Sequence, residues 1–73
     1  MQDEYYLIGE TAGKIYKALE TSGETTAVKL HKAVPVNSDL FHQALGWLAR
    51  EDKISMKWSG KTVKISLLST DKY

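Results

Sequence analysis

Apolar positions in the N-terminal third of the chain recur with the 3.6-residue period of an α-helix. The apolar residues that share one face are Tyr5, Ile8, Ala12, Ile15, Tyr16 and Leu19. They span about 100° of a helical wheel, the width of a stripe that is buried against a core. Tyr6 and Leu7 lie off this stripe. Gly23 follows the last apolar position and accepts the positive φ that ends many helices, so we expect the first helix to end near Ser22.

Residues 24–33 predict a brief extended stretch followed by a short second helix. Thr25 and Thr26 favour an extended backbone, and a threonine side chain is also a good helix N-cap. The residues of this helix that are expected to face the core are Val28, Leu30 and Ala33. A helix this short is stable only when it packs against the rest of the protein. Pro35 prevents its continuation and directs the chain into a turn.

A third helix is predicted to begin at Asn37 or Ser38, because both residues are good N-caps. Asp39 then lies in the first turn, where the helix dipole stabilises a negative charge. The broad apolar arc of this helix consists of Leu40, Phe41, Ala44, Leu45, Trp47 and Leu48. The opposite face carries Asp39, His42, Gln43, Gly46 and Arg50.

After Glu51 and Asp52 the hydrophobic period changes from 3.6 to 2, which predicts two β-strands. A turn at Gly60-Lys61, with glycine first as a type II′ turn prefers, joins them into a hairpin. This register pairs Ile54 with Leu67, Met56 with Ile65 and Trp58 with Val63. All the apolar side chains then share one face. A turn one residue earlier would instead set Trp58 opposite Lys61, so we favour the first register.

The apolar residues of the helices and strands are predicted to form one core. Its expected members are Ile8, Ile15, Leu19, Leu30, Leu45, Leu48, Ile54 and Ile65. Trp47 and Trp58 are expected in this core or at its edge, with a role at an interface as the alternative. A chain of 73 residues is expected to form one domain, residues 1–73, and to bury only about 60% of its unfolded surface.

The chain contains no cysteine, which excludes disulfides and thiolate metal sites and is typical of a reducing cytoplasm. The N-terminus, MQDEYYLIG, has neither the basic start nor the apolar run of a signal peptide. No window approaches the ~20 apolar residues of a membrane span. We therefore expect the whole chain to be a cytoplasmic protein that does not contact a membrane.

Few residues offer catalytic or metal-binding chemistry. His31 and His42 are the only histidines, and they have no partner at a spacing typical of metal ligands. The acidic pairs Asp3-Glu4 and Glu51-Asp52 lie at predicted helix ends, where solvated charges are common. No nucleophile elbow, phosphate-binding glycine loop or dinucleotide fingerprint is present. We expect neither enzymatic activity nor a cofactor nor a metal.

The formal net charge of +1 is far from the strongly basic balance of a protein built mainly to neutralise phosphates. Any affinity for nucleic acid must therefore come from local charge. The predicted hairpin carries three lysines, Lys57, Lys61 and Lys64, and no acidic residue lies between Lys53 and Leu68. The favoured register sets Lys57 directly opposite Lys64, and like charges in that position repel each other. Lysines on an exposed strand also have a simpler role, which is to discourage aggregation.

Three helices followed by a two-stranded antiparallel hairpin form an α+β, mainly α, architecture in the order of a winged helix-turn-helix domain. The segments that resemble the helix-turn-helix and wing entry of bacterial regulators are Thr26–Leu30, Val34–Asn37 and Leu40–Ile54. Nearly the whole chain resembles the small, stand-alone winged helix-turn-helix proteins of bacteria, a largely uncharacterised family. These motifs are mostly core positions, so they specify the fold more closely than the role.

The resemblance implies that the third helix is the recognition helix and the hairpin is the wing. Carried over by position, the residues that would face the major groove are Ser38, Asp39, His42, Gln43, Gly46 and Arg50. Lys57, Lys61 and Lys64 would approach phosphates. The resemblance thus implies a DNA-binding or transcription-associated protein whose binding to double-stranded DNA is weak and mainly through phosphates.

One departure from that pattern supports an alternative. The third helix carries a carboxylate, Asp39, at its start and a single arginine, Arg50, at its end, whereas DNA affinity depends mostly on cations. The alternative is a protein-interaction or homodimerisation module that does not bind DNA. Its candidate interface residues are Tyr6 and Leu7, off the buried stripe, and Gly46, a mid-helix glycine on the outward face.

Overall fold

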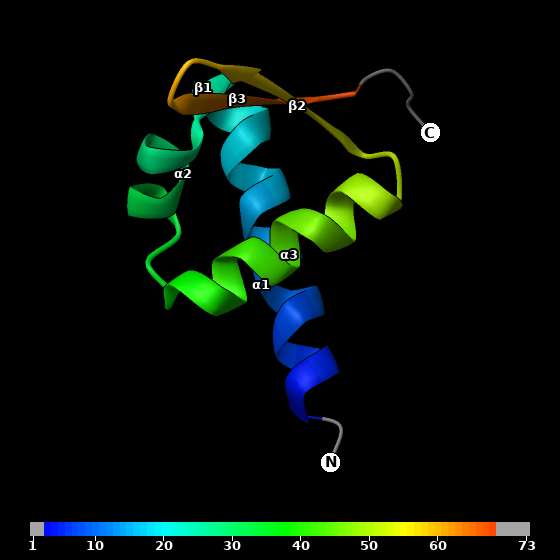
Figure 1. The fold of residues 1–73 in the computed structure, drawn as a ribbon. Coiled ribbons are helices and arrows are strands. Elements are labelled where there is room, and N and C mark those ends of the chain that lie inside the picture. Colours follow the sequence, from blue (N-terminus) through cyan, green and yellow to red (C-terminus); the bar gives the residue numbers. More distant parts are fainter. Residues whose placement is uncertain (1–2, 69–73) are drawn as a thin grey trace.

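The computed structural model describes residues 3–68, with side chains from Tyr6 onward. The elements follow in the order α1 (Asp3–Ser22), β1 (Thr25–Thr26), α2 (Ala27–Ala33), α3 (Ser38–Arg50), β2 (Ile54–Ser59) and β3 (Thr62–Leu67). In Figure 1, α3 crosses α1, α2 lies beside them, and the sheet covers one end of the helices. This is the mainly helical, winged arrangement that the sequence predicts.

The helix boundaries follow the local signals in the sequence. Gly23 adopts a φ of 76° immediately after α1, and its amide donates to the Leu19 carbonyl oxygen at 2.8 Å. Thr26 caps α2 by accepting from the Lys29 amide at 3.3 Å. The cap of α3 is Asn37, whose side-chain oxygen accepts from the Leu40 amide at 2.8 Å. The predicted end of the first helix at Ser22 is confirmed.

The hairpin of β2 and β3 has the predicted register. Ile54 pairs with Leu67, Met56 with Ile65, Trp58 with Val63, and Lys57 with Lys64. The turn residue Gly60 has a φ of 62°, as the first position of a type II′ turn requires. The amide of Leu68 donates to the Lys53 carbonyl oxygen at 3.0 Å and closes the base of the hairpin.

The sheet has three strands, in the order β1-β3-β2, whereas the sequence predicted a two-stranded wing. The brief extended stretch at Thr25 and Thr26 is present, and it pairs antiparallel with β3, Thr25 opposite Ile65 and Thr26 opposite Lys64. A free strand edge has unpaired backbone donors and acceptors, and these two residues satisfy part of that edge of β3. The pairing attaches the start of α2 to the wing.

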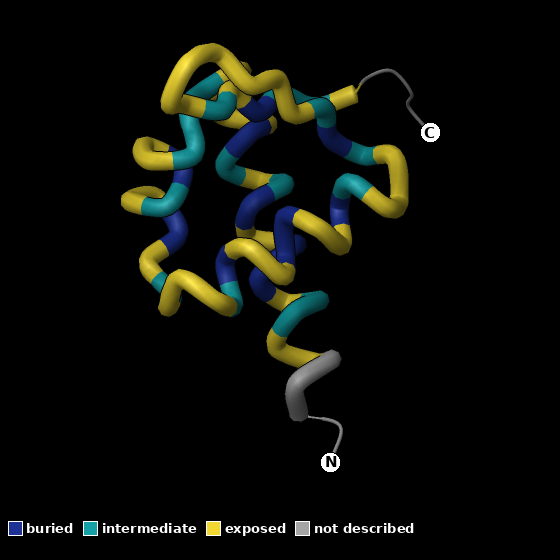
Figure 2. Tube along the Cα trace, viewed as in Figure 1, coloured by how far each residue is buried: buried dark blue, intermediate teal, exposed yellow. Residues whose placement is uncertain are grey.

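The core lies where α1 and α3 cross under the sheet (Figure 2). Its buried apolar residues are Ala12, Ile15, Leu19, Leu30, Val34, Phe41, Ala44, Leu45, Leu48, Ile54 and Ile65. All the predicted core residues except Ile8 are among them. Ile8 is half-buried because the N-terminal turns of α1 extend beyond α3 (Figures 1 and 2). Tyr5, which the sequence also placed on the buried stripe, lies outside the described side chains.

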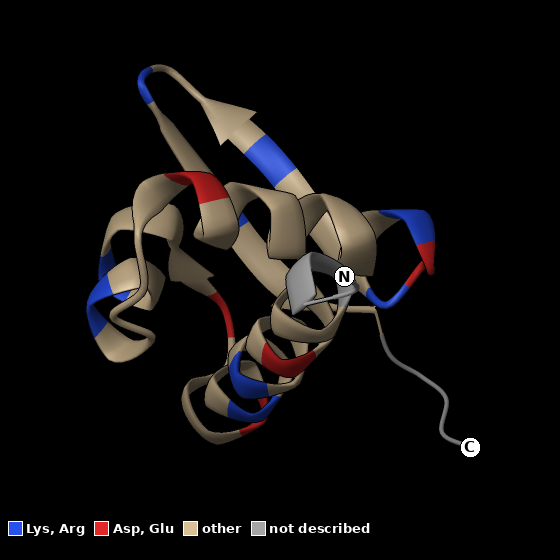
Figure 3. Cartoon of the chain, turned by 90° about the horizontal axis from the view of Figure 1, so that it is seen from below, with Lys and Arg blue, Asp and Glu red and all other residues tan. Residues whose placement is uncertain are grey.

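Three further residues that the sequence placed against the core or at its edge, Val28, Ala33 and Trp58, are exposed. Val28 is 63% exposed and Ala33 is also exposed, because the seven-residue α2 buries only Leu30. Trp58 is 75% exposed, although it lies on the predicted face of the hairpin, because the tip of the wing extends beyond the helices (Figure 3). Trp47 is 40% exposed and lies at the edge of the core.

Replacing Leu45, which is 4% exposed, with alanine should lower the free energy of unfolding by about 2 to 5 kcal/mol, because the change leaves a cavity where α3 meets the core. Leu7→Ala provides a matched control, since Leu7 is 44% exposed and the same atoms are removed. Its cost should stay below about 1 kcal/mol. Urea unfolding followed by circular dichroism measures both. Equal midpoints for Leu45→Ala and the parent protein would contradict the core assignment.

Candidate nucleic-acid interface

The exposed face of α3 carries the residues that the sequence placed in the major groove. Ser38, Asp39, His42, Gln43, Gly46 and Arg50 are all exposed. The opposite face buries Phe41, Ala44, Leu45 and Leu48. His42 Nδ1 donates to the Ser38 carbonyl oxygen at 2.8 Å and lies 3.4 Å from Ser38 Oγ, so these two candidates contact each other. The structure therefore brings the predicted α3 residues together on one accessible surface.

The charge on this part of the molecule is unfavourable for binding phosphates. Asp39 lies in the first turn of α3, and Glu51 and Asp52 follow its last residue. Arg50 is the one permanent cation in residues 38–52, against those three carboxylates. Because DNA affinity depends mainly on neutralising phosphates, this helix supplies little of that energy.

The wing lysines lie on a different surface from the exposed face of α3. Side chains alternate between the two faces of a strand, so Lys57 and Lys64 lie on the face opposite Ile65, which is fully buried against the helices. We call the face that carries Ile65 the inner face of the wing and the other face its outer face. Lys61 lies in the turn at the wing tip. The predicted DNA-contacting residues are thus divided between α3 and the outer face and tip of the wing.

Two further lysines, which the sequence analysis did not include in the site, lie on α2. Lys29 and Lys32 are both exposed. Lys29 and Lys64 line one depression of about 210 Å³, together with Glu24, Thr25 and Thr26. This proximity follows from the pairing of β1 with β3, which sequence periodicity did not predict. A usable signal was present, because residues 25–38 contain lysines and no carboxylate.

We define the lysine surface as Lys29, Lys32, Lys57, Lys61 and Lys64, all exposed. Segments 25–38 and 53–68, which carry it, contain no aspartate or glutamate. The acidic residues of the described chain lie instead in α1, at Glu24, and at the two ends of α3. Figure 3 shows Lys and Arg along the wing and α2, with no acidic segment on the wing. The small net charge therefore conceals an uneven distribution of charge, although Glu24 lines one depression with Lys29 and Lys64.

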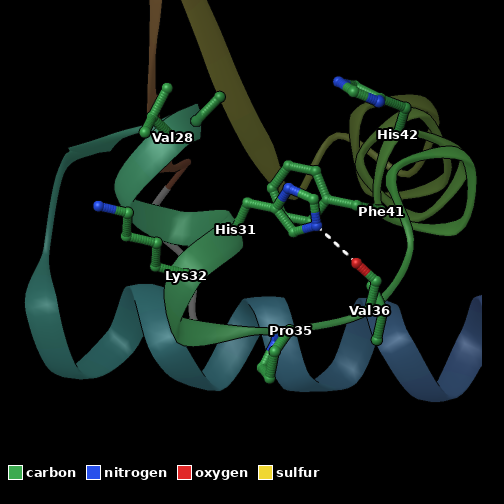
Figure 4. A pocket seen from close by; sticks show the side chains of 8 residues that line it. Val28, His31, Lys32, Pro35, Val36, Phe41 and His42 are labelled. Carbon is green, nitrogen blue, oxygen red and sulfur yellow. Dashed lines mark hydrogen bonds between the residues drawn. The ribbon is translucent and has the colours of Figure 1, made fainter.

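An open groove of about 650 Å³ lies between α2 and α3 (Figure 4). Its lining residues are Ala27, Val28, His31, Lys32, Pro35, Val36, Phe41 and His42. His31 Nε2 donates to the Val36 carbonyl oxygen at 2.6 Å, and the ring stacks on Phe41 with centroids 4.4 Å apart. Val36 lies in the turn between α2 and α3, so this bond fastens the turn to α2. Among residues 3–68, no group of His, Asp and Glu side chains could hold a metal ion.

The candidate interface residues lie on the two crossing helices. Tyr6 is 67% exposed and Leu7 is 44% exposed, on the part of α1 that extends beyond α3 (Figure 1). Gly46 is exposed on α3, and a Cβ at this position would meet nothing within 4 Å. A groove of about 360 Å³ runs between α1 and α3. Its lining includes Gly9 and Gly13. Within the described part of the chain, no helix is both long and apolar enough to cross a membrane.

Comparison with known proteins agrees with this architecture. The solution NMR structure of protein BT2368 from Bacteroides thetaiotaomicron superimposes with a TM-score of 0.75 and 27% identity, over 85% of this chain and 76% of that one. The uncharacterised protein MJ1608 of the archaeon Methanocaldococcus jannaschii is 49% identical over 57 residues, which cover 74% of this chain and 80% of that protein. The similarity thus extends to an archaeal protein, and the bacterial origin implied by the resemblance stays an expectation.

A family model described as a winged helix-turn-helix domain (DUF2582) matches residues 1–67. This range includes α1, α2, α3 and all three strands, and so contains the complete winged helix. It also contains both surfaces described above, the exposed face of α3 and the lysine surface. The chain therefore belongs to this family of winged helix-turn-helix domains.

Proposed function

We propose that this chain is a DNA-binding, transcription-associated module of the cytoplasm that has no catalytic site and holds double-stranded DNA weakly, mainly through phosphates. Membership of a winged helix-turn-helix family supports a binding role. The observation that carries the proposal is the lysine surface, five exposed cations on α2 and the wing with no carboxylate in the segments that bear them. The affinity for double-stranded DNA comes mainly from this surface.

The lysine surface favours an anionic partner for a local reason. Lys57 and Lys64 are directly opposed on adjacent strands, and like charges in that position destabilise a sheet. Lys29 lies near the same position, since it lines one depression with Lys64. A phosphate between these ammonium groups would remove their repulsion and add attraction. Glu24 lines the same depression and opposes a phosphate there, whereas the carboxylates of α1 and α3 lie outside these segments.

The exposed face of α3 has a secondary role in this proposal. Gln43 can pair with adenine, and Arg50 with guanine or a phosphate, so both provide a modest preference among bases. Ser38 and His42 lie at the N-terminal end of the same face and can contact sugar or phosphate oxygens. Asp39 opposes binding there because a carboxylate next to phosphates is repelled. The bound complex therefore depends on α2 and the wing for affinity.

Titration of a labelled duplex over a range of salt concentrations tests the proposal. The plot of log affinity against log salt should have a slope of about −3 if the three wing lysines contact phosphates, and about −4.5 if all five lysines do. Lys57→Gln/Lys64→Gln should reduce the size of the slope by about 2 without changing sequence preference. Asp39→Asn should strengthen binding.

Lys14→Gln/Lys17→Gln is the matched control, since it removes the same charge from exposed positions on α1. It should leave the slope unchanged. Two results would contradict the mechanism: no binding of duplex at 50 mM salt, or equal effects of the two double substitutions. The second result would mean that only net charge matters.

Self-association is a second candidate function, favoured by the open helix surface at Gly46. Glycine inside a helix costs about 0.5 to 1 kcal/mol relative to alanine, and close approach of another backbone is one compensation. In the described part of the chain, no atom outside the backbone of the helix itself lies within 4 Å of the position of the missing Cβ. Trp47, the next residue, is 40% exposed, and Tyr6 and Leu7 add apolar surface on α1. A second copy that packs against α1 and α3 would cover these groups.

The substitution Gly46→Ala tests whether a second copy of the chain packs against this glycine. The substitution should stabilise the monomer by about 0.5 to 1 kcal/mol, because the added methyl group enters open space. It should also shift the monomer–dimer equilibrium toward monomer if Gly46 lies against a second backbone. Sedimentation equilibrium over a concentration series measures the shift, with Tyr6→Ala as a second variant. A parent protein that stays monomeric to high micromolar concentration would eliminate this candidate function.

A further inference from the structure

The inner face of the wing carries an aromatic side chain that the rest of the protein leaves uncovered. Trp58 is 75% exposed, the largest fraction among the large hydrophobic side chains described. Met56, on the same face and strand, is 37% exposed, and Val63, the partner of Trp58, is half-buried. Exposure of an indole ring to water is unfavourable, so a partner that covers Trp58 would gain a large part of its binding energy there.

The charge around Trp58 identifies the chemistry of that partner. Lys57 precedes Trp58, Lys61 lies in the adjacent turn, and residues 53–68 contain no carboxylate. β2 is an edge strand of the sheet, so a chain that passes along this edge can reach both Trp58 on the inner face and Lys57 on the outer face. Cations beside an exposed aromatic ring suit a polymer of phosphates and flat bases, that is, a nucleic acid.

The position of Trp58 favours an unpaired base over a base pair in a duplex. In an intact duplex the faces of the bases are covered by their neighbours, so an aromatic side chain can stack only where it separates two of them. In a two-stranded wing, the side chain best placed to act in this way is one at the tip of the hairpin. Trp58 is paired with Val63 inside the ladder, before the turn, and strand side chains stand roughly perpendicular to the sheet. Its ring is therefore presented from the face of the wing.

We propose that the inner face of the wing is a stacking platform on which Trp58 holds an unpaired base, while Lys57 and Lys61 hold the adjoining phosphates. This inference rests on the proposed function, because the same lysines that contact the phosphates of a duplex also hold the phosphates of the single strand. The inference also specifies the ligand more narrowly: the chain prefers DNA that contains a single-stranded segment to a continuous duplex of equal charge.

Tryptophan fluorescence tests the platform directly. The Trp47→Phe variant leaves Trp58 as the only tryptophan, because the sequence contains two. This variant is titrated with oligo(dT), with an abasic oligonucleotide of the same length and charge, with a blunt duplex, and with poly-L-glutamate. Oligo(dT) should quench Trp58 strongly by stacking. The other three ligands should leave its emission nearly unchanged.

Affinity measurements on charge-neutral variants provide a second readout. Trp58→Ala should weaken binding of oligo(dT) by roughly 5- to 150-fold, the range measured for loss of one stacked base, and should leave duplex affinity within about twofold. Trp58→Phe should retain part of the lost affinity, since a phenyl ring still stacks. Trp47→Ala is the matched control and should have little effect. A thermal melt of each variant confirms that it is folded.

The outcomes separate this inference from the proposed function. Equal binding of oligo(dT) and the abasic strand, or unchanged affinity in Trp58→Ala, overturns the platform, whereas duplex binding with the expected salt slope still supports the proposed function. Strong quenching by oligo(dT) without duplex binding supports the platform and overturns the proposed duplex binding. Quenching by poly-L-glutamate as strong as that by oligo(dT) assigns this face to an acidic protein and also overturns the platform.

Discussion

The packing of α1 against α3 is the constraint on which the rest of this small protein depends. Ile15 and Leu19 of α1 meet Phe41 and Ala44 of α3 in a core that is closed by Ile65 of the sheet. A chain of 73 residues buries a limited area, so no other element is stable without this crossing. The seven-residue α2 inserts only Leu30 into the core. Its position is fixed further by the pairing of β1 with β3 and by the bond from His31 to the Val36 carbonyl oxygen.

The small size of the core also determines which surfaces remain for function. The sheet is covered by the helices only near Ile54 and Ile65, so Trp58, farther along β2, is exposed on the inner face of the wing. The pairing of β1 with β3 brings Lys29 of α2 next to Lys64 of the outer face, and so joins two segments without carboxylates. The acidic residues of the described chain lie on α1 and at the two ends of α3, except Glu24, which lines one depression with Lys29 and Lys64. The short strand β1, which joins α2 to the sheet, thus places a lysine of α2 beside a lysine of the wing.

The sequence predicted the elements and the hairpin register because strong local signals specify them. Gly23, Asn37 and Gly60 each end, cap or turn an element through their own backbone or side chain, so no distant contact is needed. The pairing of Thr25 with Ile65 joins residues forty positions apart in the chain, and no local period encodes it. For the same reason the contribution of Lys29 to the candidate site was not predicted.

The solvent exposure of a side chain was harder to predict than the face of the helix or strand on which it lies. Alternation along β2 correctly assigned Trp58 to the face of Ile54, but it contains no information on how far the helices extend beneath that face. Val28 was wrongly assigned to the core because a helix of two turns has too few residues to define its buried side by periodicity. The role of α3 in DNA binding, and that of the lysine surface, depend on a partner molecule and stay predictions.

The central claim is that affinity for nucleic acid originates on α2 and the wing. Backbone amide shifts in ¹H–¹⁵N spectra, recorded during titration with a short DNA duplex at low salt, test it residue by residue. We predict the largest changes at Lys29, Lys57, Lys61 and Lys64 and at their neighbours, with smaller changes along Ser38–Arg50. Changes confined to α3, with α2 and the wing unaffected, would contradict the account.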